Sequence, residues 1–116
     1  MKKYSYFTED EMRCKCGCGT LIVQPLHFFR MNLLRHAINS PLTPSSWCRC
    51  PDHNQAVGGK DTSSHPEGWA TDIVTFTLLF QVKIIFYAGV IGFHGIGVGD
   101  TFVHLDNDLI KGANRF

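Results

Sequence analysis

A histidine and an aspartate in the middle of the sequence have a spacing that suits one metal ion. His65 and Asp72 are seven positions apart with Gly68 between them, so a turn at the glycine can bring an imidazole nitrogen and a carboxylate oxygen together. His104 lies in the run Thr-Phe-Val-His-Leu-Asp, which is typical of a strand and can present the histidine on one face. Two histidines and one carboxylate leave a fourth position for water, the pattern of a catalytic rather than a structural zinc site.

Further segments surround these candidate ligands in a recognisable order. The ligand segment reads His65-x-x-Gly68-x-Ala70-x-Asp72 and is followed by Phe-Val-His-Leu-Asp at residues 102–106. Residues 7–19, 47–54 (Trp-Cys-Arg-Cys-Pro-Asp-His-Asn), 56–59 (Ala-Val-Gly-Gly) and 95–98 (Gly-Ile-Gly-Val) complete the set. Together they resemble the zinc D-alanyl-D-alanine carboxypeptidase family of peptidoglycan peptidases, and the ordered set is specific where one segment alone would be weak.

The resemblance implies an α+β fold that is shared with the hedgehog signalling domain. In this fold a small antiparallel sheet packs with two or three helices, and the zinc site lies in a cleft. Arg49 lies where the family has an arginine that contacts substrate and stabilises the developing oxyanion. Ser63 lies where the family often has a serine, whose hydroxyl can bind substrate or cap a turn.

The general base is the point at which the sequence departs from the family. Many relatives have Glu or Asp three residues before the last histidine, where this chain has Thr101, which has no basic group near neutral pH. We predict Asp100 as the base, because on a regular strand it would share a face with His104. Asp106 and His94 are the alternatives.

The five cysteines form two groups, Cys14, Cys16 and Cys18 followed by Cys48 and Cys50. A disulfide within a Cys-x-Cys segment is strained, so a disulfide would join the two groups. Thiolates from both groups could instead bind a second, structural metal, although the spacing lacks the usual Cys-x-x-Cys. Free buried thiols are the third possibility, and the sequence leaves all three open.

The elements of the first half must position Arg49. Residues 21–23 are short and apolar and predict a strand, and Pro25 suits the first position of a helix over residues 26–39. Residues 47–50 predict a short strand that carries Arg49, and residues 51–64 a long surface loop that walls one side of a cleft. The face of the predicted helix that we expect to be buried carries apolar residues at helical spacing: Leu26, Phe29, Leu33, Leu34, Ala37 and Ile38. We expect His27 and His36 to be solvated.

The elements of the second half must position the ligands. Residues 69–75 predict a strand that carries Asp72. Residues 77–88 predict a buried helix that ends at Gly89. Residues 93–106 predict two strands around a turn near Gly99 and Asp100.

Length and charge limit the function classes. With 116 residues we expect one domain over residues 1–116. Eleven Lys and Arg against ten Asp and Glu give a net charge of +1, so there is no basic field to attract nucleic acid or anionic lipid. We expect a monomer with no nucleic-acid partner.

We also expect no export signal and no membrane insertion. The N-terminal residues lack the apolar run of a secretory signal. The most apolar stretch, residues 78–88, is interrupted by Gln81 and Lys83 and is shorter than the ~20 residues of a spanning helix. The protein is therefore expected to be made in the cytoplasm and to act on the cell wall after lysis, holin release or another export route.

The expected function is zinc-dependent hydrolysis of peptidoglycan stem peptides, as in a phage endolysin or an accessory wall enzyme. The bond cut would be D-Ala-D-Ala for a carboxypeptidase or L-Ala-D-Glu for an endopeptidase. The alternative is a binding or structural module that keeps zinc without turnover, as the hedgehog domain does, because the usual acid is missing at Thr101.

Overall fold

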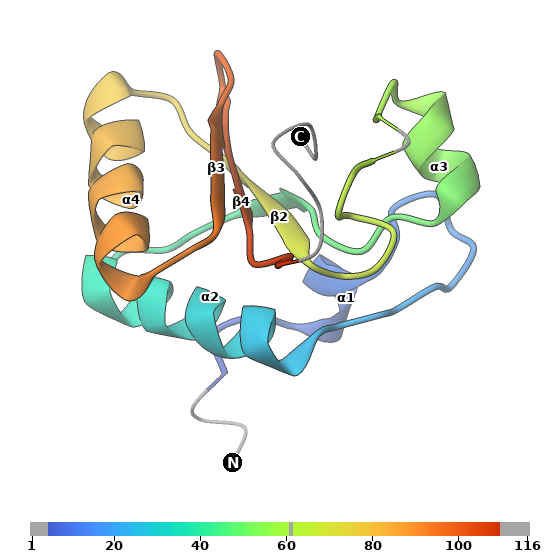
Figure 1. The fold of residues 1–116 in the computed structure, drawn as a ribbon, viewed down its shortest axis with the longest axis horizontal. Helices are drawn as coiled ribbons and strands as arrows, with labels where there is room; N and C mark the ends of the chain where they lie inside the picture. The colour runs from blue at the N-terminus through green and yellow to red at the C-terminus, as the bar shows by residue number, and fades with distance from the viewer. Residues whose placement is uncertain (1–4, 61, 110–116) are drawn as a thin grey trace.

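The computed structural model describes residues 5–60 and 62–109 as an antiparallel sheet with helices around it (Figure 1). The strands are β1 (Pro44–Ser46), β2 (Ala70–Val74), β3 (Gly95–Val98) and β4 (Phe102–Asp106), in the order β1-β2-β4-β3. The helices are α1 (Glu9–Met12), α2 (Pro25–Ile38), α3 (Pro51–Ala56) and α4 (Leu78–Ile91). The predicted α+β class with a small antiparallel sheet is confirmed.

The two faces of the sheet have different roles because side chains alternate along a strand. On one face Ile73 lies opposite Val103, and both are buried in the core with residues of α2 and α4. On the other face Asp72 lies opposite His104. The register between β2 and β4 therefore places two of the three predicted ligands side by side, away from the hydrophobic core.

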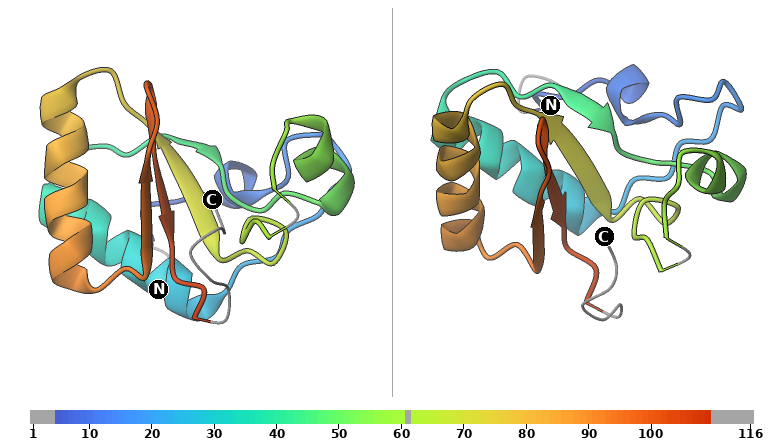
Figure 2. Two further views of the ribbon diagram at one scale, coloured as in Figure 1. Left: turned by 45° about the horizontal axis from the view of Figure 1, so that its top comes forward. Right: turned by 90° about the horizontal axis from the view of Figure 1, so that it is seen from above.

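Helices lie on both sides of the strands. In Figures 1 and 2, α4 and α3 lie on opposite sides of the strands, and α2 runs beneath them in the view of Figure 1. α4 contributes Ile84 and Ala88 to the core, and α2 contributes Met31 and Leu34. The core thus fixes β2 and β4 from one face, while α3 and the segments next to it border the other.

α2 begins where the sequence predicts but buries a different face. Pro25 is at the start of the helix, and Asn39 ends it in a left-handed conformation with φ 55°. The buried residues recur at helical spacing; they are His27, Met31, Leu34 and Ile38. The predicted face is wrong for four residues that are exposed, namely Leu26, Phe29, Leu33 and Ala37.

His27 is fully buried, so the prediction that it is solvated is wrong. Its Nδ1 lies 2.8 Å from Asn107 Nδ2, and its Nε2 lies 2.8 Å from Thr71 Oγ1. The amide nitrogen must donate, so Nδ1 accepts and Nε2–H donates to the threonine. Burial, followed by the nearby His65 and His104, lowers the pKa of His27 to about 3. A neutral histidine therefore ties α2 to β2 and to the residue after β4.

α4 is a helix as predicted, but it is neither buried nor ended by Gly89. It continues to Ile91, and Gly92 ends it with φ 99°. Only part of its surface faces the core; the large apolar residues that it exposes are Leu78, Leu79, Val82, Phe86 and Val90. Among the described residues, no helix has the length and hydropathy needed to cross a bilayer.

Three further expectations for the first half are wrong, and two for the second half are confirmed. Residues 21–23 and 47–50 are not strands, and β1 lies before Trp47 instead. The predicted loop at residues 51–64 begins with α3, for which Pro51 at the first position and Cys50 as the capping residue were available signals. The strand that carries Asp72 and the hairpin of β3 and β4 are confirmed.

Gly68 makes the turn between His65 and Asp72 that the sequence predicts. It has φ 77°, and a Cβ at this position would collide with the carbonyl group of Ile22. We expect Gly68→Ala to lower the free energy of unfolding by about 1–3 kcal/mol, because alanine is strained at this φ and has no space.

The matched control is Gly89→Ala, inside α4, where a Cβ meets nothing within 4 Å. This change should leave stability unchanged or raise it by up to ~1 kcal/mol, since alanine favours a helix interior. Urea unfolding of both variants measures the difference. Equal stabilities would show that the turn at Gly68 is not constrained.

Candidate metal centre

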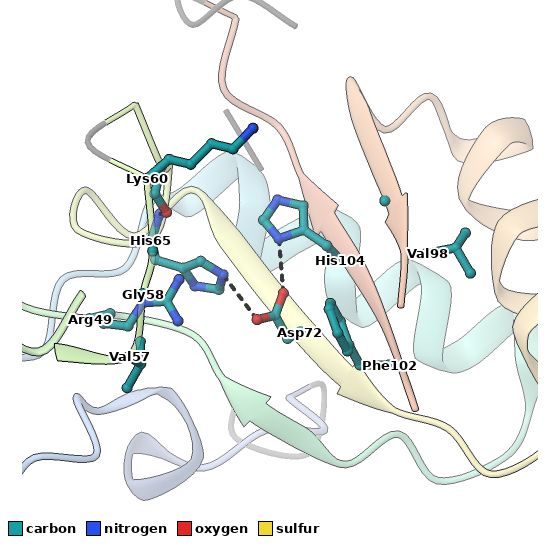
Figure 3. A pocket seen from close by; sticks show the side chains of 12 residues that line it. Arg49, Val57, Gly58, Lys60, His65, Asp72, Val98, Phe102 and His104 are labelled. Carbon is teal, nitrogen blue, oxygen red and sulfur yellow. Dashed lines mark hydrogen bonds and ion pairs between the residues drawn. The ribbon is translucent and has the colours of Figure 1, made fainter. Parts of the chain in front are cut away.

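Three side chains from different segments converge on the face of the sheet that lies away from the core (Figure 3). His65 precedes β2, Asp72 lies in the middle of β2, and His104 lies in the middle of β4. One ligand atom from each lies within 4.8 Å of the others. His65 Nε2 is 3.2 Å from Asp72 Oδ2, and His104 Nδ1 is 2.8 Å from Asp72 Oδ1. The three predicted ligands are therefore together in the structure.

The surroundings of His65 suit a metal ion. Its side chain is almost fully buried, and its Nδ1 lies 2.7 Å from the carbonyl oxygen of Trp47. A carbonyl only accepts, so Nδ1 carries the proton and Nε2 of the neutral ring carries a lone pair. Nε2 is buried without a hydrogen-bond partner among the described residues and faces a carboxylate oxygen. Two electron-rich atoms at this distance fit a cation that both would ligate, and imidazole nitrogen with carboxylate oxygen is a donor set that zinc accepts.

His104 is held from two sides by carboxylates. Its Nδ1 faces Asp72, and its Nε2 lies 3.0 Å from Asp106 Oδ2. Burial alone would lower the pKa of His104, but the hydrogen bonds to Asp106 and Asp72 outweigh burial and raise it. Burial alone would raise the pKa of Asp72, but the contacts with His104 and His65 hold it well below its usual range. Asp72 is therefore ionised, as a ligand must be.

Asp106 orients His104 from behind. It is fully buried, its Oδ2 contacts His104, and its Oδ1 accepts a hydrogen bond from the backbone N–H of Asp108 at 3.3 Å. A carboxylate on the far nitrogen of a ligand histidine fixes the ring and raises its basicity. Asp106 was one of the alternative bases in the sequence analysis. In the structure its carboxylate contacts His104 and positions the ring.

The three ligands lie in a pocket of about 470 Å³ that also contains Arg49. Arg49 is in the loop between β1 and α3, and its backbone N–H donates to the carbonyl oxygen of His65 at 3.2 Å. Figure 3 shows its guanidinium directed toward His65 and Asp72. Burial lowers the pKa of Arg49 while Asp72 favours the charged form, and a guanidinium stays charged in a protein. Its Nε is buried without a hydrogen-bond partner among the described residues.

Two other residues line the pocket: Ser63, which the sequence analysis predicted, and Lys60, which it did not. Ser63 lines the pocket, and its Oγ accepts a hydrogen bond from the backbone N–H of His65 at 3.2 Å, so it caps the turn before the site. Its contact with substrate stays a prediction. Lys60 also lines the pocket and adds a second cation, and sequence reasoning missed it because a lysine in a polar loop has no distinguishing pattern.

None of the three candidate bases lines the pocket. Asp100 is exposed in the turn between β3 and β4, and β4 begins only at Phe102, so the premise that Asp100 shares a strand face with His104 is wrong. Asp106 is buried behind His104, and His94 is exposed. Among the described residues that line the pocket, the only carboxylate is Asp72. The role of Asp100 as general base stays a prediction without geometric support.

We expect Asp106→Asn to weaken zinc binding by about 10–100-fold, the usual effect of losing a partner of a ligand histidine. Both carboxylate oxygens accept hydrogen bonds, so an amide would turn its NH₂ toward one of the two donors. Asp100→Asn, at the exposed turn, is the matched control and should leave zinc affinity unchanged. Competition with a chromogenic chelator measures both variants. Equal zinc affinities in the two variants would show that Asp106 does not support His104 as a ligand. A loss of affinity confined to Asp100→Asn would show that the hairpin turn reaches the metal.

Comparison with known proteins gives one match. A family model described as Peptidase M15 matches residues 5–106 of the chain. Neither the search of curated proteins nor the search of solved structures gives a match.

Proposed function

The chain belongs to the peptidase M15 family, whose members are zinc-dependent peptidases, and on this premise we propose that it hydrolyses the stem peptides of peptidoglycan at the His65, Asp72 and His104 site. The observation that carries the proposal is the convergence of these three side chains in a pocket lined by Arg49, with the buried His65 Nε2 facing Asp72 Oδ2 at 3.2 Å. Zinc at this site would supply a Lewis acid that lowers the pKa of a water molecule and polarises the carbonyl group of the scissile peptide.

The residues of the chain hold the donor atoms in position. The Trp47 carbonyl oxygen accepts a hydrogen bond from His65 Nδ1–H. The other ring nitrogen, Nε2, therefore carries the lone pair that can bind a metal. Asp106 accepts from His104 Nε2–H, which leaves Nδ1 of that ring beside Asp72. Because these contacts exist before any substrate binds, the site needs little reorganisation, and this lowers the cost of binding and of reaction.

Arg49 and Lys60 give the pocket a positive rim that suits a substrate carboxylate. A stem peptide cut at D-Ala-D-Ala or at L-Ala-D-Glu has an α-carboxylate on the residue that leaves, so the cations would serve either reaction. We assign Arg49, which lies beside the ligands, to the carbonyl oxygen on which negative charge develops, and Lys60 to the carboxylate.

The test is digestion of purified muropeptides followed by mass spectrometry. A carboxypeptidase would release one alanine from pentapeptides, and an endopeptidase would separate the stem peptide after L-Ala. Either product supports the proposal and identifies the bond. If zinc-loaded, folded protein leaves every muropeptide intact, the proposed function is wrong.

One observation favours a second candidate, a zinc-containing module that binds stem peptides without turnover. A peptidase needs an acceptor for the proton of the attacking water, and Asp100, Asp106 and His94 all lie outside the lining of the pocket. In calorimetry such a module would bind tetrapeptide or pentapeptide stems, and its affinity would be lower in Arg49→Ala than in wild type. It would release no product. Binding with turnover excludes this alternative.

A further inference from the structure

Four of the five cysteines converge on the side of the molecule near α3. Cys14, Cys16 and Cys18 lie in the loop after α1, and Cys50 lies directly before α3. Their sulfur atoms all lie within 4.8 Å of one another. The Cys14 and Cys16 sulfurs are 3.5 Å apart, and the Cys16 and Cys50 sulfurs are 3.7 Å apart. Segments that are 34 residues apart in sequence thus bring their thiols to one point.

These separations match a shared metal ion and not a disulfide. A disulfide has an S–S distance of about 2.05 Å, and all five cysteines are free. Zinc bound by four thiolates has Zn–S distances of about 2.3 Å, which places neighbouring sulfurs roughly 3.8 Å apart in a tetrahedron. The observed sulfur contacts are within a few tenths of an ångström of that edge length.

The backbone of the loop is shaped to aim three thiols from five residues at one centre. Gly17 and Gly19 alternate with the cysteines and have φ 89° and 85°, a conformation that residues with a side chain rarely adopt. A Cβ at either glycine would meet nothing within 4 Å, so backbone conformation rather than space accounts for glycine here. The short Cys-x-Cys-x-Cys spacing, which differs from the usual Cys-x-x-Cys, is therefore compatible with convergence.

Backbone N–H groups point at the sulfurs. The N–H of Cys50 donates to Cys14 Sγ at 3.3 Å, that of His53 to Cys50 Sγ at 3.4 Å, and that of Thr20 to Cys18 Sγ at 3.4 Å. Such hydrogen bonds stabilise negative charge on sulfur, and partners of this kind orient metal ligands.

We propose that Cys14, Cys16, Cys18 and Cys50 bind one structural zinc ion, separate from the His65, Asp72 and His104 site. Four protein ligands leave no open position for water, so the ion would stabilise the fold and would not take part in the reaction. Cys48 is outside this set: it is buried, and its sulfur accepts from the backbone N–H of Ile22 at 3.4 Å. The odd number of cysteines is thereby explained as four ligands and one core residue.

A zinc ion in this cluster would connect two segments of the chain. Cys50 follows Arg49, so zinc would tie the loop after α1 to the segment that carries the pocket arginine. A bound metal contributes its binding free energy to folding, and a chain with a modest core gains from this contribution.

The experiment measures metal content and the spectrum of the cobalt-substituted protein. Wild type purified without chelator should contain two zinc ions per chain, Cys16→Ser one, and His65→Ala one. Cobalt(II) in place of zinc should give the near-ultraviolet charge-transfer absorption of cobalt thiolates in wild type and in His65→Ala, and should lose it in Cys16→Ser. Cys48→Ala is the matched control and should keep both the second ion and the absorption.

The results separate this proposal from the proposed function. If the His65 site held no zinc, wild type would contain one ion and would still show the cobalt–thiolate absorption, and Cys16→Ser would lose both. Should Cys16→Ser fail to fold, a mercurial titration of wild type keeps the test: zinc should be released in proportion to the blocking of four thiols. A zinc content that is equal in wild type and Cys16→Ser, no cobalt–thiolate absorption, or a mass that shows disulfides in the native protein would each overturn the proposal.

Discussion

Replacing His65 by alanine is expected to remove zinc from the His65, Asp72 and His104 site and to lower kcat/KM by about 10³-fold or more. Two protein ligands rarely hold zinc at useful affinity. The Lewis-acid contribution of a catalytic metal is several kcal/mol, and each 1.4 kcal/mol is a factor of ten in rate. His104→Ala should have the same effect, because its Nδ1 lies on the other side of Asp72.

His36→Ala is the control for this pair. His36 is in α2, and its Nδ1 lies 2.9 Å from the hydroxyl of the exposed Tyr6, away from the pocket, so metal content and turnover should stay those of wild type. Zinc analysis and muropeptide turnover are measured on the same preparations. If His65→Ala keeps its zinc at this site and turns over normally, the assignment of the ligands is wrong.

Arg49→Ala is expected to lower kcat by about 10²–10³-fold with zinc content unchanged, the range observed when one donor to a developing oxyanion is removed. The guanidinium lines the pocket and is directed toward the ligands, where it can donate to an oxyanion that forms beside them. Arg49→Lys keeps the charge but loses the planar fork of donors, and it should recover only part of the rate.

Lys60→Ala is the companion measurement, because this lysine lines the same pocket but is exposed. It should raise KM more than it lowers kcat, as expected for a residue that binds substrate and transition state equally. If Arg49→Ala instead raises KM and leaves kcat unchanged, Arg49 binds substrate and does not stabilise the oxyanion.

The residues of the sheet show what the sequence could predict. The β-branched and aromatic residues of the run at 101–106 and the turn near Gly99 predicted the β3 and β4 hairpin, and Gly68 predicted the turn before Asp72. These signals are local, because a two-residue side-chain period and a left-handed glycine depend on neighbours in the chain. They predicted the turn and the strands that carry the ligands, whereas the prediction that His65, Asp72 and His104 form one site rested on their spacing together with the family resemblance.

The misplaced residues depend on contacts between distant parts of the chain. His27 shares its helical spacing with the buried Met31 and Leu34. A histidine is accommodated there because Thr71 and Asn107, 44 and 80 positions away, satisfy its two ring nitrogens, and these partners cannot be read from α2 alone. Asp106 and the Trp47 carbonyl have their roles only once β4 and the Arg49 loop are packed. Asp100 was chosen on the assumption of a strand that continues to residue 100, and the hairpin turn begins before it.

The most direct test of the account is the release of stem-peptide products from purified peptidoglycan by protein that is stripped of metal and then reloaded with zinc. The products are detected by mass spectrometry, and circular dichroism verifies the fold in each state. We expect products from the native protein, none after stripping, and their return with zinc in wild type but not in His65→Ala. Folded, zinc-loaded wild type that releases nothing, or stripped protein that cuts as fast as the native protein, would contradict this expectation.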